Sequence, residues 1–261
     1  MKHKFLTLFA LPFLMCSCTL DEILEKLNLK GASEEEIMQY AVENAEKWDD
    51  AFENMFFTNY TMDVYFDSRY GIMDGEIVEL GEHYQHHNHL EVCDTAVLYQ
   101  IGVESHDYDI YMEKSGEEWF AYRYKDESKM YELITAQELH GSSDLTVEQA
   151  KNQMVEEASL YVTFKNDYDK FTFNEEAHEY YCEGIIKCDL NDEIYGEMDL
   201  AARKVHIKFE KGQLVSMAAS YVCYEDENKI QEYFDKVGDA YTFEITNIGR
   251  TVVQQPTNIK K

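Results

Sequence analysis

The feature that most constrains the fold is an alternation of apolar and mostly polar residues that returns along much of the chain. Residues 60–66 (Tyr-Thr-Met-Asp-Val-Tyr-Phe) show it first. The same alternation recurs at residues 108–112, 120–124, 205–209 and 241–245. Because successive side chains of a strand point to opposite faces, this period predicts half-buried β-strands. Ser115-Gly116 and Lys211-Gly212 are turn signals between flanking strands, so we expect hairpins there.

Three segments follow a helical period instead. Ser33 opens one with a capping-box spacing, and its apolar residues recur at three- and four-residue steps to about Phe56. Thr146 opens the second in the same way, and the third is expected over residues 226–237, with Gly238 as its stop. The inward stripe of the second helix should hold Val147, Ala150, Met154 and Ala158.

These elements predict one α+β domain over residues 33–261. Strands dominate, and no linker separates the two runs of strands on either side of the second helix. We therefore expect a single, strongly curved antiparallel sheet, a half-barrel, with helices packed on its concave face.

The first residues have the pattern of a secretory signal peptide. Lys2 and Lys4 supply positive charge, and residues 5–15 form an uncharged apolar run. As a helix, that run would cross only about half of a hydrocarbon core, so it does not predict a permanent membrane span. We expect a signal peptide over residues 1–17 and export of the chain.

Two cysteines end this apolar run, in an arrangement that resembles a lipobox. Cys18 follows the small Ser17, whereas Cys16 follows a bulky methionine, so Cys18 is the expected site of lipid attachment. Two acyl chains on one cysteine hold a protein stably on a membrane. The sequence thus predicts a lipid-anchored protein on the extracytoplasmic face of the cell membrane, with residues 18–32 as a tether. Ordinary secretion without lipid is the alternative.

The charge of the chain excludes one class of partner. It carries 52 acidic and 23 basic residues, a net charge of −29, and has no basic run. Such a surface repels the phosphates of nucleic acids. We expect no nucleic-acid partner.

The most unusual local sequence is the histidine-rich segment from His83 to His89. On a strand, His83, His87 and His89 share one face, and imidazoles are good ligands for zinc, copper or nickel. His83 and His87 would lie about 13 Å apart, too far to share one ion. Only His87 and His89 can approach closely, and a further ligand would have to come from elsewhere. We therefore interpret the segment as a polar strand or loop and assign no metal site.

The sequence contains no motif for catalysis. The remaining cysteines are Cys93, Cys182, Cys188 and Cys223. Export permits disulfides among them, and buried free thiols are the equal alternative. No Cys-x-x-Cys, Gly-x-Ser-x-Gly, His-Glu-x-x-His or phosphate-loop motif is present, so we expect neither an enzyme nor a cofactor.

Four features together carry a resemblance to a known family. They are the lipobox, residues 166–173 (Asn-Asp-Tyr-Asp-Lys-Phe-Thr-Phe), the hairpin 205–215 and the ending 243–249 (Phe-Glu-Ile-Thr-Asn-Ile-Gly). The chain resembles cell-surface lipoproteins of low-GC bacteria whose domain is similar to the lipoprotein-carrier half-barrel. That resemblance implies binding of lipid or acylated molecules in the concave face, but no individual binding residue carries over.

The expected function is therefore binding of an apolar or acylated ligand. Met and aromatic side chains make adaptable apolar walls, although a fully packed β core needs the same residues. The walls should draw on Met62, Val64, Tyr108, Ile110, Phe120 and Tyr122. The alternatives are an interaction or structural lipoprotein of the cell envelope and a metal-binding lipoprotein that uses the histidine-rich segment. The sequence names no protein partner.

Overall fold

The computed structural model describes residues 48–52, 59–73, 76–103, 108–142, 144–159, 162–174, 176–177, 179–188, 199–210 and 213–260. Cys18, the signal peptide and the tether lie outside these residues. Of the helix expected to reach Phe56, residues 48–52 are described, and they are helical.

Strands make up most of the described chain, as the alternation predicts. They are β1 (Tyr60–Met73), β2 (Glu76–Cys93), β3 (Ala96–Ile101), β4 (Tyr108–Ser115), β5 (Glu118–Lys125), β6 (Met130–Ile134), β7 (Thr172–Asn174), β8 (Glu179–Cys182), β9 (Ile186–Cys188), β10 (Asp199–Glu210), β11 (Gln213–Tyr224) and β12 (Tyr241–Thr246). The histidine-rich segment lies in β2, so it is a strand and not a loop.

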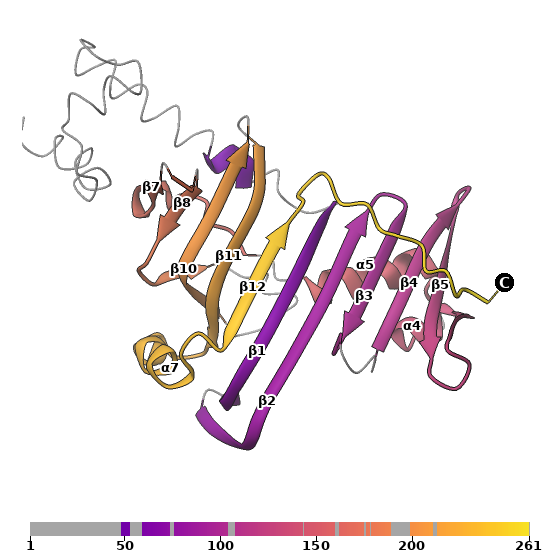
Figure 1. The fold of residues 1–261 in the computed structure, drawn as a ribbon, viewed down its shortest axis with the longest axis horizontal. Coiled ribbons are helices and arrows are strands. Elements are labelled where there is room, and N and C mark those ends of the chain that lie inside the picture. Colours follow the sequence, from indigo (N-terminus) through magenta and orange to yellow (C-terminus); the bar gives the residue numbers. More distant parts are fainter. Residues whose placement is uncertain are drawn as a thin grey trace, which may run out of the picture.

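The described strands form one open, curved sheet with antiparallel pairing (Figure 1). Its order is β6-β5-β4-β3-β2-β1-β12-β11-β10-β8-β7, and β9 pairs with β10 beside this path. Neighbours in sequence mostly pair with each other because short connections suffice between antiparallel strands. There are two exceptions among the described strands. β10 pairs with β8, and the central pair of β1 and β12 joins the two ends of the domain into one sheet.

The second predicted helix is confirmed as α5 (Val147–Ala158). The Thr146 hydroxyl accepts a hydrogen bond from the Gln149 amide, and the Gln149 side chain accepts one from the Thr146 amide. Met154 on its stripe is buried in a cluster with side chains of the sheet. A short helix that the sequence did not indicate, α4 (Ala136–His140), precedes it, and both lie behind β3 to β5 in the view of Figure 1.

The third predicted helix is also confirmed, as the 3₁₀ turn η2 (Glu227–Lys229) followed by α7 (Ile230–Val237). Gly238 ends α7 with a φ of +66°, a conformation that costs glycine little. Its apolar residues pack with Ala201 and Val222 in a cluster separate from that of α5. A second 3₁₀ turn, η1 (Tyr168–Lys170), leads into β7.

We name the two faces of the sheet by what covers them. The inner face carries the largest buried cluster, which includes Met62 and Leu90 and is shared with α5. The outer face is the opposite one. α7 packs on its lower end, and the C-terminal segment 251–260 crosses it above β2 to β5 (Figure 1). There Val253 and Ile259 pack against Tyr111 and Tyr131, and Ile259 pairs with β6.

Trp48 is the centre of an aromatic core at the β8 and β10 end of the inner face. Its side chain is 3% exposed, and its Nε1 donates a hydrogen bond of 2.8 Å to the carbonyl oxygen of Phe164. Among the described residues, the aromatic rings with centroids between 4.9 and 5.5 Å from that of Trp48 are those of Phe52, Tyr168, Phe171, Tyr180 and Phe209. The described part of the first predicted helix is therefore an element of the core.

Candidate functional site

The structure separates the six residues expected to line one cavity. Met62, Val64, Tyr108 and Ile110 belong to the inner-face cluster or pack against it. In β5 the inner positions are instead Trp119 and Ala121, and Tyr122 packs on the outer face with Tyr111. Phe120 is two residues from Tyr122 and shares its face. The prediction that Phe120 and Tyr122 line the same cavity as the other four residues is therefore wrong. In β5 the neighbouring positions, Trp119 and Ala121, face inward.

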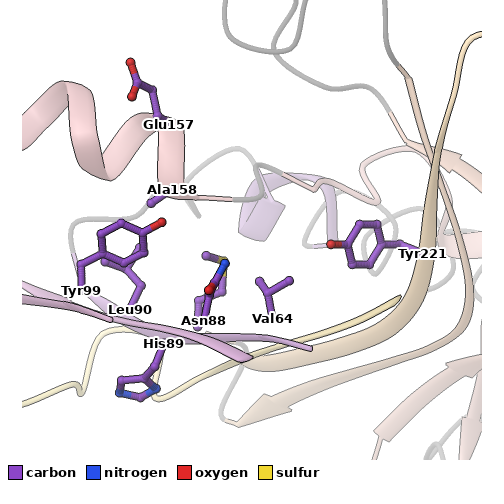
Figure 2. Close-up of a pocket in the computed structure, with 9 residues that line it drawn as sticks. Val64, Asn88, His89, Leu90, Tyr99, Glu157, Ala158 and Tyr221 are labelled. Carbon is purple, nitrogen blue, oxygen red and sulfur yellow. The ribbon is translucent and has the colours of Figure 1, made fainter. Parts of the chain in front are cut away.

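A hollow of about 200 Å³ lies on the inner face, between the central strands and the C-terminal end of α5 (Figure 2). Of the six expected residues, Met62 and Val64 line it, whereas Ile110 is fully buried in the core beside it. The described residues that line it are Met62, Val64, Asn88, His89, Leu90, Tyr99, Glu157, Ala158 and Tyr221. Figure 2 shows the ring of His89 pointing to the other side of the sheet. The hollow is thus lined about equally by polar and apolar surface.

Polar groups gather where α5 approaches the hollow. Glu157 is paired with His140, with 3.1 Å between Oε1 and Nε2. Burial raises the pKa of Tyr99 to about 12, and the nearby Tyr108 and Glu157 add to the effect. The Tyr99 hydroxyl is therefore neutral at physiological pH and can donate a hydrogen bond to a ligand.

On the outer face, three polar side chains converge across β1 and β2. Asp63 stands directly opposite His89 in the register of the two strands, and His87 lies two residues from His89 on the same face. Asp63 Oδ1 is 2.7 Å from His87 Nε2 and 2.8 Å from His89 Nδ1. The second ring nitrogen of His89, Nε2, is 3.4 Å from Glu91 Oε1. We call Asp63, His87 and His89 the outer-face triad.

The outer-face triad is partly shielded from solvent, which strengthens its electrostatics. The side chains of Asp63 and His89 are each 19% exposed. Hydrogen bonds to Asp63 and Glu91 outweigh burial and raise the pKa of His89 to about 9. Burial alone would raise the pKa of Asp63, but its hydrogen bonds with His89 and His87 lower it overall. His89 is therefore an imidazolium paired with an ionised Asp63 at neutral pH.

Tyr65 and Glu244 flank the outer-face triad. The Tyr65 ring stacks on that of His87, with centroids 4.2 Å apart and an interplanar angle of 18°. Glu244 stands opposite Asp63 on β12, so a second carboxylate borders the triad. A shallow hollow of about 300 Å³ begins at these two residues and continues over β12, β11 and β10. The hollow thus lies next to the triad, whose own side chains are partly exposed.

The other histidines of β2 lie apart from the outer-face triad. His83 pairs with Asp67; these residues lie four residues along their strands from His87 and Asp63. His86 points to the opposite face by the alternation of the strand, and its ring stacks on Tyr84 with centroids 5.8 Å apart. The expectation that only His87 and His89 approach each other agrees with this arrangement, since the ring centroids of the two lie 6.4 Å apart.

Cys93, Cys182, Cys188 and Cys223 are free thiols in the structure. The sequence left open disulfides or buried free thiols. In the structure Cys182 and Cys188 are buried free thiols, whereas Cys93 and Cys223 are half-buried. Burial raises the pKa of Cys223 to about 11, so this thiol is protonated and weakly reactive.

Comparison with known proteins adds no assignment. No family model matches the sequence, and no curated protein matches it. Within the described residues, no helix is long and apolar enough to cross a membrane.

Sequence reasoning found two members of the outer-face triad and missed the third. Asp63 lies in the first alternating segment, residues 60–66, where its position predicts only a solvent-facing side chain. A hairpin between β1 and β2 could have indicated the third member, because pairing of these two alternating segments places Asp63 on the same face as His87 and His89. Its position opposite His89 depends on the register, which the sequence did not provide.

Proposed function

We propose that this protein is a membrane-anchored extracytoplasmic lipoprotein that binds a small apolar or acylated ligand, and that it is not an enzyme. The observation that carries the proposal is the hollow between the sheet and the end of α5, whose lining residues include the apolar Met62, Val64 and Leu90. The neutral hydroxyl of Tyr99, one of its lining residues, can donate a hydrogen bond to the polar end of such a ligand. In this proposal the sheet is a half-barrel, and α5 lies in its concave face.

The size of the hollow limits the ligand. Its volume of about 200 Å³ is below the roughly 300–1,000 Å³ of pockets that enclose drug-sized ligands. We therefore propose a short acyl chain, or the end of a longer one, as the group that enters. The tight packing of Ile110 and Met112, both 0% exposed, closes the core beyond it.

A displacement assay tests this proposal. A fluorescent short-chain fatty acyl probe should bind the full-length chain in detergent and be displaced by unlabelled fatty acids of similar length. Val64→Trp should fill the hollow and weaken probe binding at least tenfold. Val252→Trp makes the same change at a side chain that is 70% exposed and should leave binding unchanged. Absence of saturable binding, or equal loss in both variants, would contradict the proposal.

The anchor is tested separately. Cys18→Ala should abolish acyl labelling and move the protein from the detergent phase to the aqueous phase. Cys16→Ala should leave both unchanged. The reverse result would assign the lipid to Cys16, and retention of both variants in the detergent phase would contradict the lipoprotein assignment.

One observation favours a second candidate, an interaction or structural lipoprotein of the cell envelope. Three large side chains are exposed on the distal half of the β1 and β2 hairpin: Met73 at 60%, Tyr84 at 50% and Leu80 at 37%. Exposed apolar groups that gather on one element are typical of contact surfaces. If no acyl probe binds, this second candidate becomes the better proposal.

A further inference from the structure

Three potential metal ligands converge on one point of the outer face. They are Asp63 Oδ1, His87 Nε2 and His89 Nδ1, and all three atoms lie within 4.8 Å of one another. Two of these atoms are imidazole nitrogens and the third is a carboxylate oxygen, which together are a common ligand set for zinc. Asp63 and His89 stand opposite each other in the antiparallel pair of β1 and β2, and His87 is the diagonal neighbour of Asp63. The backbone of the two strands therefore holds all three residues in place.

The distances suit an ion with bonds of about 2 Å. In a tetrahedral site with such bonds, neighbouring ligand atoms lie about 3.3 Å apart. Asp63 Oδ1 is now 2.7 and 2.8 Å from the two nitrogens. An ion therefore needs these pairs to separate by about half an ångström, which small rotations of the side chains provide.

The surroundings of the outer-face triad support this use beyond the ligands themselves. A histidine that binds a metal usually donates its second ring N–H to a carboxylate, which sets the orientation of the ring. Glu91 occupies that position at Nε2 of His89, on the side of the ring away from Asp63. Tyr65 stacks on His87 and restricts the rotation of that ring as well.

The local charge also favours a cation. Glu91 and Glu244 border the triad, and the whole chain has a net charge of −29. Such a field raises the local concentration of divalent cations. The side chains of the triad are 19–28% exposed, so a water molecule can reach the ion and complete the coordination.

We propose that Asp63, His87 and His89 bind one divalent transition-metal ion, with zinc as the best fit, and that Glu91 is a positioning residue for His89. The proposal differs from the sequence-based interpretation of the segment as a polar strand or loop without a metal site. It lies on the other face of the sheet from the ligand hollow and does not depend on the function proposed there.

Metal titration of the full-length chain tests the proposal. The protein, carrying a histidine-free tag, is stripped with EDTA and titrated with Zn²⁺ by calorimetry and with Co²⁺ by absorption spectroscopy. We expect one Zn²⁺ per chain with a dissociation constant in the micromolar range or tighter. The Co²⁺ spectrum should show tetrahedral d–d bands without a thiolate charge-transfer band.

Variants assign the ligands. His87→Gln, His89→Gln and Asp63→Asn should each weaken Zn²⁺ binding at least tenfold. Matched controls on the same strand, His83→Gln and His86→Gln, should bind as the unmodified chain does. Glu91→Gln should weaken binding by roughly 10–100-fold while the stoichiometry and the melting temperature of the EDTA-treated protein stay the same.

Three outcomes would overturn the proposal. The first is no saturable Zn²⁺ binding, which would make the outer-face triad an ion-pair cluster only. The second is equal loss of affinity in His83→Gln or His86→Gln. The third is loss of binding in Cys93→Ser together with a thiolate band, which would move the metal to the half-buried cysteine. Melting curves of each variant in EDTA establish that the fold is retained.

Discussion

The two faces of one strand pair, β1 and β2, carry opposite chemistry one residue apart. On the inner face, Met62 and Leu90 stand opposite each other and are 2% and 1% exposed. The next pair along the ladder, Asp63 and His89, lies on the outer face and forms a charged cluster with His87. Burial of apolar side chains stabilises the inner face of this strand pair, and ion pairs stabilise its outer face.

This difference shows what holds the register of the central hairpin. A slip of one residue between β1 and β2 would place Asp63 or His89 among apolar side chains and bring Met62 or Leu90 to the outer face. Leaving a charge without a partner in an apolar environment costs several kcal/mol, so both faces disfavour the slipped pairing. Substitutions can change the side chains of one face while leaving those of the other unchanged.

The largest effect should come from a charge placed under the inner face. Met154 of α5 is 6% exposed, and Met154→Asp would bury a carboxylate without a partner. We expect the free energy of unfolding, measured in urea, to fall by roughly 3–5 kcal/mol. Gln153→Asp places the same charge on the exposed side of the helix and should change it by less than about 0.5 kcal/mol. A melting temperature within a degree or two of the unmodified chain for Met154→Asp would show that the stripe does not pack on the sheet.

A somewhat smaller loss should follow from a void on the inner side of the hairpin. Leu90→Ala removes a side chain that is 1% exposed, and we expect a destabilisation of about 3 kcal/mol. Leu133→Ala is the matched control, because Leu133 on β6 is 61% exposed and should cost far less. Equal losses in urea denaturation would mean that burial of Leu90 does not contribute as described.

On the outer face the expected effect depends on pH. The pKa of His89 is raised to about 9 in the folded chain, from about 6.5 in an unfolded one. The stabilisation from its pairing is therefore fully present below about pH 6.5 and is lost as the pH rises through about 9. The groups that face it are Asp63 and Glu91, with Glu244 next to Asp63 on β12.

We expect unfolding in urea with EDTA to show this loss. Between about pH 6 and about pH 10, the unmodified chain should lose roughly 1–3 kcal/mol more stability than His89→Gln. His86→Gln, on the other face of the strand, should follow the unmodified chain. An identical pH profile for the unmodified chain and His89→Gln would contradict the assigned ion pairs.

The smallest effect should come from the ring stacked on the outer-face triad. Tyr65→Thr keeps a residue suited to a strand and removes the stack on His87. Because Tyr65 is 38% exposed, we expect a destabilisation below about 1 kcal/mol, measured by thermal melting in EDTA. A loss as large as that of Leu90→Ala would mean that the two faces contribute equally, against the comparison above.

Much of the local structure could be predicted from the sequence. Which side chains of a strand face the inner side of the sheet could not be predicted for every strand. Alternation identifies two sets of side chains in β5 without saying which set is inside. In most strands the outer set is polar, which settles the question. In β5 the outer set is the more aromatic one, with Phe120, Tyr122 and Tyr124, because the C-terminal segment covers the outer face near Tyr122 with Val253 and Ile259. That cover comes from residues more than a hundred positions away, so no local pattern reveals it.

The sequence by itself determined the elements whose causes are local. The period of side chains determines strands and helices, and the capping box at Thr146 and the stop at Gly238 determine where α5 and α7 begin and end. The tertiary structure alone decided the neighbours: β1 beside β12, Trp48 against Phe164, and Asp63 between His87 and His89. Those contacts depend on strand order and register. Both are set by long-range packing of the whole sheet, because a strand's own alternation is compatible with many partners.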